Sequence, residues 1–205
     1  MHNFLISGIL NQNIILFYMI NGGIDNNTFD FLMPLITNFG SLVAWVVICG
    51  LLFVFGGEKG RKVAIVGLAA LFISNVAVYL LKLLIAEPRP FLTLPNVELL
   101  VPENEIYSFP SGHTASSFAA AVVIGLKYKL NIKGKNYRLI YPLLAFAGLI
   151  GFSRIYIGVH YPLDVIFGAI VGILSALLVL RVEDNFLIDK LSHVCLLDKL
   201  NTREI

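Results

Sequence analysis

The sequence has few charged residues for its length. Lys, Arg, Asp and Glu make up 14% of the 205 residues, whereas hydrophobic residues make up 58%, and the mean hydropathy is +0.83. Soluble domains contain roughly 25% charged residues, so the composition excludes an ordinary soluble domain. The net charge is only +2. No basic block with interleaved aromatic residues occurs, and we therefore expect no nucleic-acid partner.

Cysteine is also scarce. The two cysteines are Cys49, inside an apolar run, and Cys195, near the C-terminus, and no CxxC pair occurs. This pattern favours neither a disulfide framework nor a cysteine-based metal site. The N-terminus lacks a basic segment followed by a small-residue cleavage site, so we expect no cleaved signal peptide.

Long apolar runs are what the sequence does contain. A helix needs about 20 apolar residues to cross a bilayer. Five runs are clear, at 31–55, 63–85, 111–126, 139–156 and 163–182, and Gly, Pro, Asn or charged residues separate them. The sequence therefore predicts an all-α fold, a polytopic membrane helix bundle with five clear spans.

The two ends of the chain are less regular. Residues 4–20 are apolar at both ends but polar at 11–13, which fits either a sixth span or an amphipathic helix in the interface. After Arg181, apolar residues recur near helical spacing between charges. We predict an integral membrane domain over residues 1–182 and an amphipathic tail over 183–205.

Polar residues gather where the spans end. If the five runs cross in turn, the segments 82–90, 110–113 and 153–164 all reach the same membrane face. Charges at such positions are costly, so they indicate a functional site.

Basic residues mark the other face. Every Lys and Arg except Lys82, Arg89 and Arg154 falls on the face opposite these three segments. By the positive-inside rule, that opposite face is cytoplasmic. We therefore expect a protein of the cytoplasmic membrane with an extracytoplasmic site and a cytoplasmic C-terminus.

The three remaining cations suit a phosphate group. Arg89 and Arg154 offer planar forks that match phosphate oxygens, and Lys82 acts as a point charge. The turn with Ser111 and Gly112 opens a helix, whose free N–H groups bind anions; Gly112 permits a close approach, and the Ser111 hydroxyl adds a donor. Because these cations neutralise the phosphate, we expect no metal and no cofactor.

Two histidines and one carboxylate complete a catalytic set. A neutral His160 can attack phosphorus and form a phosphohistidine. Asp164 follows one helical turn later and can hold one imidazole N–H, which leaves the other nitrogen free to attack. His113 can protonate the leaving oxygen and then activate water.

Each of these residues also has an ordinary structural explanation. Lys82 and Arg154 could be snorkelling residues at helix ends. His113 could pack at a helix start, His160 could anchor the chain at the interface, and Asp164 could cap the last helix. Their occurrence together on one face favours the catalytic interpretation.

The three segments resemble the signature of the type 2 phosphatidic acid phosphatase (PAP2) superfamily. The resemblance rests on Lys82 with Arg89 and Pro90, on Pro110, Ser111, Gly112 and His113, and on Ser153 and Arg154 with His160 and Asp164. It covers about residues 30–182 and implies a six-helix membrane fold with an outward-facing site. It also implies His160 as nucleophile, His113 as acid and base, and Asp164 as the residue that orients His160. The phosphate ligands that it implies are Lys82, Arg89, Ser111, Gly112 and Arg154.

Within this family the chain is similar to small prokaryotic lipid phosphatases and undecaprenyl-diphosphate phosphatases. The implied substrate is a lipid phosphate or diphosphate: undecaprenyl diphosphate, another isoprenyl phosphate, phosphatidate or phosphatidylglycerophosphate. Glu87 places negative charge near the site, which weighs against a diphosphate. A phosphotransferase acting on a lipid or sugar hydroxyl and a non-enzymatic lipid-binding membrane protein remain alternatives, and the sequence indicates no oligomeric state.

Overall fold

A computed structural model describes residues 2–24, 26–132 and 135–201, with side chains at 8–24, 26–129 and 135–185. This part of the chain is mostly helical, as predicted. Its helices are α1 (His2–Asn21), α2 (Asn27–Asn38), α3 (Leu42–Phe55), α4 (Gly57–Ile85), α5 (Pro90–Thr93), α6 (Gly112–Lys127), α7 (Ile140–Tyr156) and α8 (Pro162–Asn201). A short antiparallel hairpin, β1 (Lys129–Ile132) and β2 (Lys135–Arg138), was not predicted.

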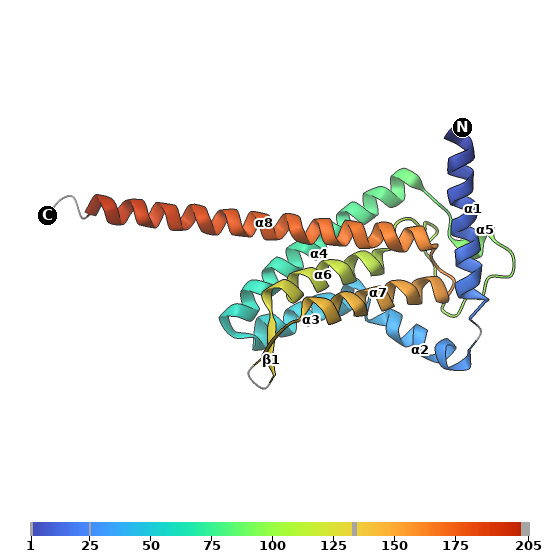
Figure 1. Ribbon diagram of the computed structural model, residues 1–205, viewed down its shortest axis with the longest axis horizontal. Coiled ribbons are helices and arrows are strands. Elements are labelled where there is room, and N and C mark those ends of the chain that lie inside the picture. Colours follow the sequence, from blue (N-terminus) through green and yellow to red (C-terminus); the bar gives the residue numbers. More distant parts are fainter. Residues whose placement is uncertain (1, 25, 133–134, 202–205) are drawn as a thin grey trace.

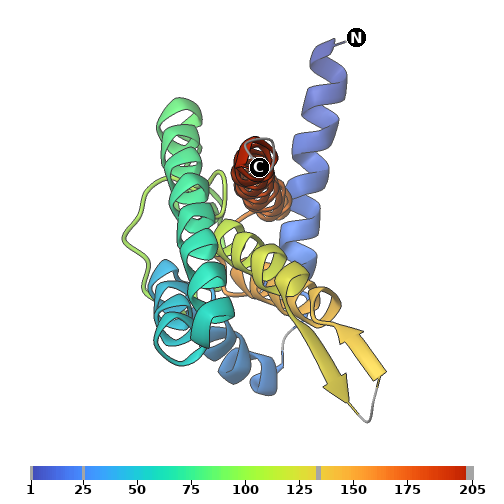
Figure 2. The same cartoon turned by 90° about the vertical axis from the view of Figure 1, so that its left-hand side faces the viewer.

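Helix α6 lies at the centre of the bundle. It packs against α4, α7 and α8, and α3 packs along α4 (Figures 1 and 2). Its buried face consists mainly of Ala, Ser and Gly, and such small residues let membrane helices approach closely. A Cβ atom at Gly168 of α8 would collide with the backbone oxygen of Ser111. The first turn of α6 is therefore held tightly against the start of α8.

The number of spans is confirmed only in part. Among the described residues, two stretches are long and apolar enough to cross a membrane, Gly57–Ile85 and Pro162–Asn185, and α2 with α3 forms a third if the bent pair is one span. Helix α7 is apolar but has 17 residues, and α6 has 16. Because α6 is surrounded by other helices, its sequence holds small and polar residues where a lipid-facing helix would hold large apolar ones.

The predicted span at 31–55 is not one straight helix. The chain is bent by 57° between α2 and α3, and Ser41 caps the second helix by accepting a hydrogen bond from the Ala44 amide (3.2 Å). A Cβ at Gly40 would lie 2.4 Å from Ile150 Cγ2 and 3.3 Å from His113 Cβ. The absence of a side chain there lets the bend sit directly against α7 and the start of α6.

Helix α1 lies across one end of the bundle (Figures 1 and 2). Its outer face exposes apolar residues such as Ile9 and Met19, while Asn13 and Asn21 are buried. The Asn21 Nδ2 group donates to the carbonyl oxygens of Glu98 and Tyr156 (both 2.8 Å). The sixth span implied by the family resemblance is not confirmed.

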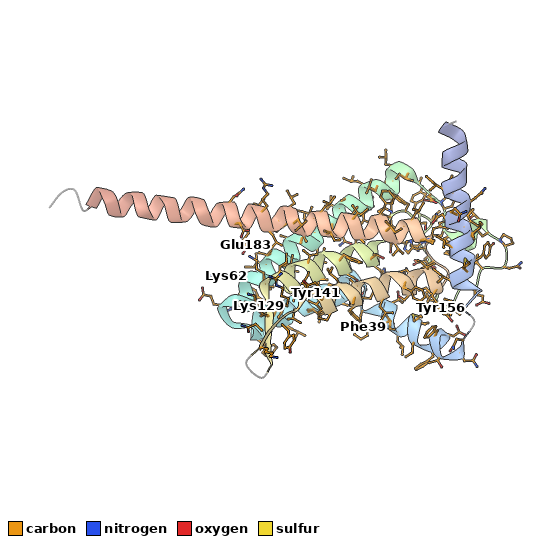
Figure 3. The ribbon with its side chains drawn as sticks, viewed as in Figure 1. Phe39, Lys62, Lys129, Tyr141, Tyr156 and Glu183 are labelled. Atoms are coloured by element: carbon orange, nitrogen blue, oxygen red, sulfur yellow. The ribbon has the colours of Figure 1, made fainter. Side chains whose placement is uncertain are left out.

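Charged side chains mark the end of the bundle opposite α1. Lys62, Lys129 and Glu183 lie near the end that carries the β-hairpin, whereas Tyr156 lies at the end crossed by α1 (Figure 3). Helix α8 continues beyond the bundle without a break at residue 183 (Figure 1). The side chains of the predicted amphipathic tail from 186 onward fall outside the described residues, so the tail and its boundary stay predictions.

Candidate active site

The loop after α5 folds back over the end of the bundle. Helix α4 ends at Ile85, and the left-handed conformation of its C-cap residue Ala86 (φ 49°) turns the chain. The following segment pairs with residues 106–108: the Arg89 amide donates to the Ile106 carbonyl (3.2 Å) and the Ser108 amide donates to the Glu87 carbonyl (2.7 Å). These contacts bring the predicted segment 110–113 next to the predicted segment 82–90.

A cavity of about 420 Å³ lies where the three segments meet. Its lining includes six of the eight residues proposed from the sequence, namely Lys82, Arg89, Gly112, His113, Arg154 and His160. Leu42, Asn75, Val78, Tyr79 and Ser116 complete the wall together with two glutamates. The predicted convergence of the segments is therefore seen in the structure.

His160 is buried and held in one orientation. Its Nδ1 atom lies 3.2 Å from Asp164 Oδ2, and its Nε2 atom lies 3.4 Å from Arg89 Nη1. A proton on Nδ1, donated to Asp164, leaves the Nε2 lone pair facing Arg89 and the cavity. Burial, followed by the charges of Arg89 and Arg154, holds the pKa of His160 well below its usual value. A lowered pKa favours the neutral imidazole, which is the form that the predicted nucleophile requires.

Asp164 lies behind His160, away from the cavity. Its Oδ2 atom accepts hydrogen bonds from the Ser108 hydroxyl and from the Tyr161 amide (2.8 Å). Ser108 Oγ is also 3.3 Å from His160 Nδ1. Sequence reasoning missed Ser108, because a serine 52 residues away from His160 has no local signal. The carboxylate is thus fixed by a small network of neighbours.

The two arginines are almost fully buried, with 1% exposure for Arg89 and 3% for Arg154. Arg89 Nη1 donates to the Val159 carbonyl (3.0 Å), and Arg154 Nη1 donates to Thr37 Oγ1 (3.1 Å). The Nε atoms of both arginines are buried without a hydrogen-bond partner among the described residues. Their guanidinium groups are therefore positioned before any ligand binds.

Two carboxylates contact these cations. Glu103 Oε2 lies 3.0 Å from Arg154 Nη2 and 3.3 Å from Arg89 Nη1. Glu105 Oε2 lies 2.9 Å from Arg89 Nη2 and 2.5 Å from Lys82 Nζ. In the sequence these glutamates read only as charges of an outer loop, because nothing local shows that the loop folds back onto the arginines.

Glu87 differs from its predicted role. It does not line the cavity, and it forms no ion pair within the described part of the chain. Burial raises the pKa of Glu87 above its usual value. The negative charge expected beside the phosphate site comes instead from Glu103 and Glu105.

Ser111 lies behind the cavity wall. Its Oγ atom accepts from the Thr114 hydroxyl (2.9 Å) and from the Thr114 amide (3.4 Å), which caps α6. Its amide donates to the Asp164 carbonyl (3.0 Å). The structure thus shows Ser111 as a cap and as a link between two segments, and its contact with phosphate stays a prediction.

Comparison with known proteins identifies the family. Residues 63–187 match the PAP2 superfamily, a range that contains all eight predicted site residues. The chain belongs to the PAP2 superfamily, as its three motifs indicated. It is 34% identical over 163 residues to undecaprenyl-diphosphatase BcrC of Bacillus subtilis, which covers 78% of this chain and 77% of that protein.

Two further relatives extend over most of the chain. An undecaprenyl-diphosphatase of Sulfolobus acidocaldarius is 30% identical over 182 residues, 89% of this chain and 84% of the relative. The crystal structure of Aquifex aeolicus LpxE matches with a TM-score of 0.70 and 33% identity, covering 83% of this chain and 95% of that one. The helical arrangement described above is therefore that of a PAP2 phosphatase.

Proposed function

We propose that this protein is a membrane lipid phosphatase that removes a phosphate from a lipid phosphate or diphosphate through a phosphohistidine on His160. The observation that carries the proposal is the orientation of His160. Asp164 holds Nδ1, while Nε2 faces Arg89 in a cavity that Lys82 and Arg154 also line. A nucleophile next to three cations fits phosphoryl transfer.

The reaction then has two steps. In the first, His160 Nε2 forms a bond to phosphorus, the bond from phosphorus to the leaving oxygen breaks, and His113 gives that oxygen a proton. In the second, His113 takes a proton from water, whose oxygen attacks phosphorus and releases His160 and inorganic phosphate. Lys82, Arg89 and Arg154 neutralise the charge that gathers on the equatorial oxygens.

The substrate and the absence of a metal requirement can be tested together. Purified protein would be given undecaprenyl diphosphate, phosphatidate or phosphatidylglycerophosphate in detergent, with and without EDTA. We expect the fastest phosphate release from undecaprenyl diphosphate, because relatives that match most of the chain are undecaprenyl-diphosphatases. We also expect EDTA to leave the rate unchanged, since the cations supply the neutralising charge.

Three results would contradict this proposal. Strong inhibition by EDTA would show that a metal takes part. Transfer of the phosphoryl group to an added lipid or sugar hydroxyl in place of water would identify a phosphotransferase. Lipid binding without any turnover would identify a lipid-binding protein.

The site is proposed to open on the outer side of the cytoplasmic membrane. Support comes from the basic residues near the opposite end, including Lys62 and Lys129 (Figure 3). A cysteine introduced at Asn104, in a variant whose own cysteines are replaced by serine, should react with a membrane-impermeant maleimide on intact cells. Reaction only after lysis would place the site on the cytoplasmic side.

A further inference from the structure

The phosphate-binding cations already have anionic partners in the structure. Glu103 bridges Arg154 and Arg89, and Glu105 bridges Arg89 and Lys82. Two carboxylates thus satisfy three cations, in the same cavity where a substrate phosphate would bind. Carboxylate and phosphate oxygens both match the fork of an arginine side chain, so the two groups compete for the same donors.

We propose that Glu103 and Glu105 are internal competitors of the substrate phosphate, which occupy its site in the free enzyme and leave when the substrate binds. This inference rests on the proposed function, because it takes the three cations to be phosphate ligands. It adds two specificity-determining residues to that function. A ligand must bring enough negative charge to replace both carboxylates, so weakly charged esters bind poorly.

The loop that carries the glutamates has few backbone contacts with the rest of the bundle, and within it the Glu105 amide donates to Glu103 Oε1 (3.2 Å). On one side it is held by hydrogen bonds from the Leu100 amide to the Ile157 carbonyl (3.3 Å) and between Glu98 and Asn21. On the other side it pairs with residues 87–89. Within the described chain, no backbone-to-backbone hydrogen bond holds residues 101–105. The carboxylates themselves therefore supply the main polar contacts of this stretch.

The two glutamates differ in their surroundings. The Glu103 side chain is 17% exposed, whereas that of Glu105 is 64% exposed. Burial raises the pKa of Glu105, but the hydrogen bond and charge of Lys82 and the charge of Arg89 together lower it by more. The net result is a pKa below the usual value, so this carboxylate is ionised. Exposed ion pairs are weaker because solvent screens them. We therefore expect Glu103 to be the stronger competitor.

A purely structural role makes the opposite prediction. If the glutamates serve to hold Arg89 and Arg154 in place, removing their charge will loosen the arginines and weaken phosphate binding. Glutamine separates the two roles, since it has the same size and keeps a hydrogen-bond acceptor but loses the charge.

The test is calorimetric binding of inorganic phosphate to the full-length protein in detergent, comparing the native sequence with E103Q, E105Q and the double variant. We expect the Kd to fall about tenfold for E103Q and about threefold for E105Q, changes of roughly 1.4 and 0.6 kcal/mol. The double variant should bind most tightly. E98Q is the matched control, because the exposed Glu98 side chain contacts none of the cations, and its Kd should equal that of the native sequence.

The possible failures are distinguishable. An unchanged or higher Kd in E103Q and E105Q, with phosphate still bound by the native sequence, would overturn the competing role and leave the proposed function intact. No phosphate binding by any form would overturn both. If E103Q does not fold, E105Q tests the same claim, because its more exposed side chain is the safer one to change.

Discussion

Replacing His160 with alanine is expected to lower phosphate release from the lipid substrate by at least about 10⁴-fold, because the nucleophile is lost. The residual rate should be that of water attacking a phosphate bound to Arg89, Arg154 and Lys82. Phosphate release at saturating lipid measures the effect. Calorimetric binding of inorganic phosphate provides the control, since the cations remain in place and the variant should still bind.

An active His160→Ala variant would contradict the phosphohistidine mechanism. It would mean that water attacks phosphorus directly and that His160 serves only to complete the wall of the cavity. If His160→Ala neither turns over lipid nor binds phosphate, its inactivity does not test the nucleophile. A His160→Gln variant, whose side chain is closer in size to histidine, should therefore be measured beside it. This second variant must also be inactive.

Replacing Asp164 with asparagine is expected to reduce kcat by about 10³- to 10⁴-fold while changing KM little. A loss of this size is known for the same substitution in serine proteases, where an aspartate fixes the tautomer of the catalytic histidine. Asp164 Oδ2 lies 3.2 Å from His160 Nδ1, and the proposed tautomer donates a hydrogen bond from Nδ1 to this carboxylate. An asparagine amide that donates to Nδ1 would favour the tautomer with its proton on Nε2, which removes the attacking lone pair. The three cations proposed to bind the phosphate are unchanged in this variant.

Asp30→Asn is the matched control for this variant. Asp30 accepts a hydrogen bond from the Tyr156 hydroxyl (2.6 Å) and does not line the cavity, so the same chemical change there should leave kcat unaffected. A normal kcat in Asp164→Asn would show that the orientation of His160 does not depend on this carboxylate. A rise in KM with unchanged kcat would place Asp164 in substrate binding.

Most of the residues that line the candidate site were predictable, because their signals are local or follow from counting spans. The four-residue spacing of His160 and Asp164 fixes their proximity once α8 begins, and the cations at 82, 89 and 154 stand out against apolar runs. Helices α4 and α8 are also visible as long apolar stretches. These features depend on residues close in sequence, or on the simple rule that successive spans alternate in direction.

The rest depends on contacts between distant residues. Gly40 bends the chain where α7 approaches, and α6 is short and rich in Ala and Ser because other helices surround it. Nothing in the neighbourhood of Ser108 or Glu103 indicates that each meets a residue more than 50 positions away, His160 and Arg154 respectively. Contacts of this kind leave no periodic pattern in the sequence, so sequence reasoning did not predict that Ser108 and Glu103 lie in the candidate site.

The most direct test of the central claim is to trap the intermediate on His160. Full-length protein in detergent would be mixed rapidly with undecaprenyl diphosphate that is radiolabelled on its terminal phosphate, then quenched in alkali, which preserves phosphohistidine. We expect label bound to the protein within the first turnover, at His160 in the peptide map, and none in Asp164→Asn on the same timescale. Phosphate release without any label on His160 would contradict the account.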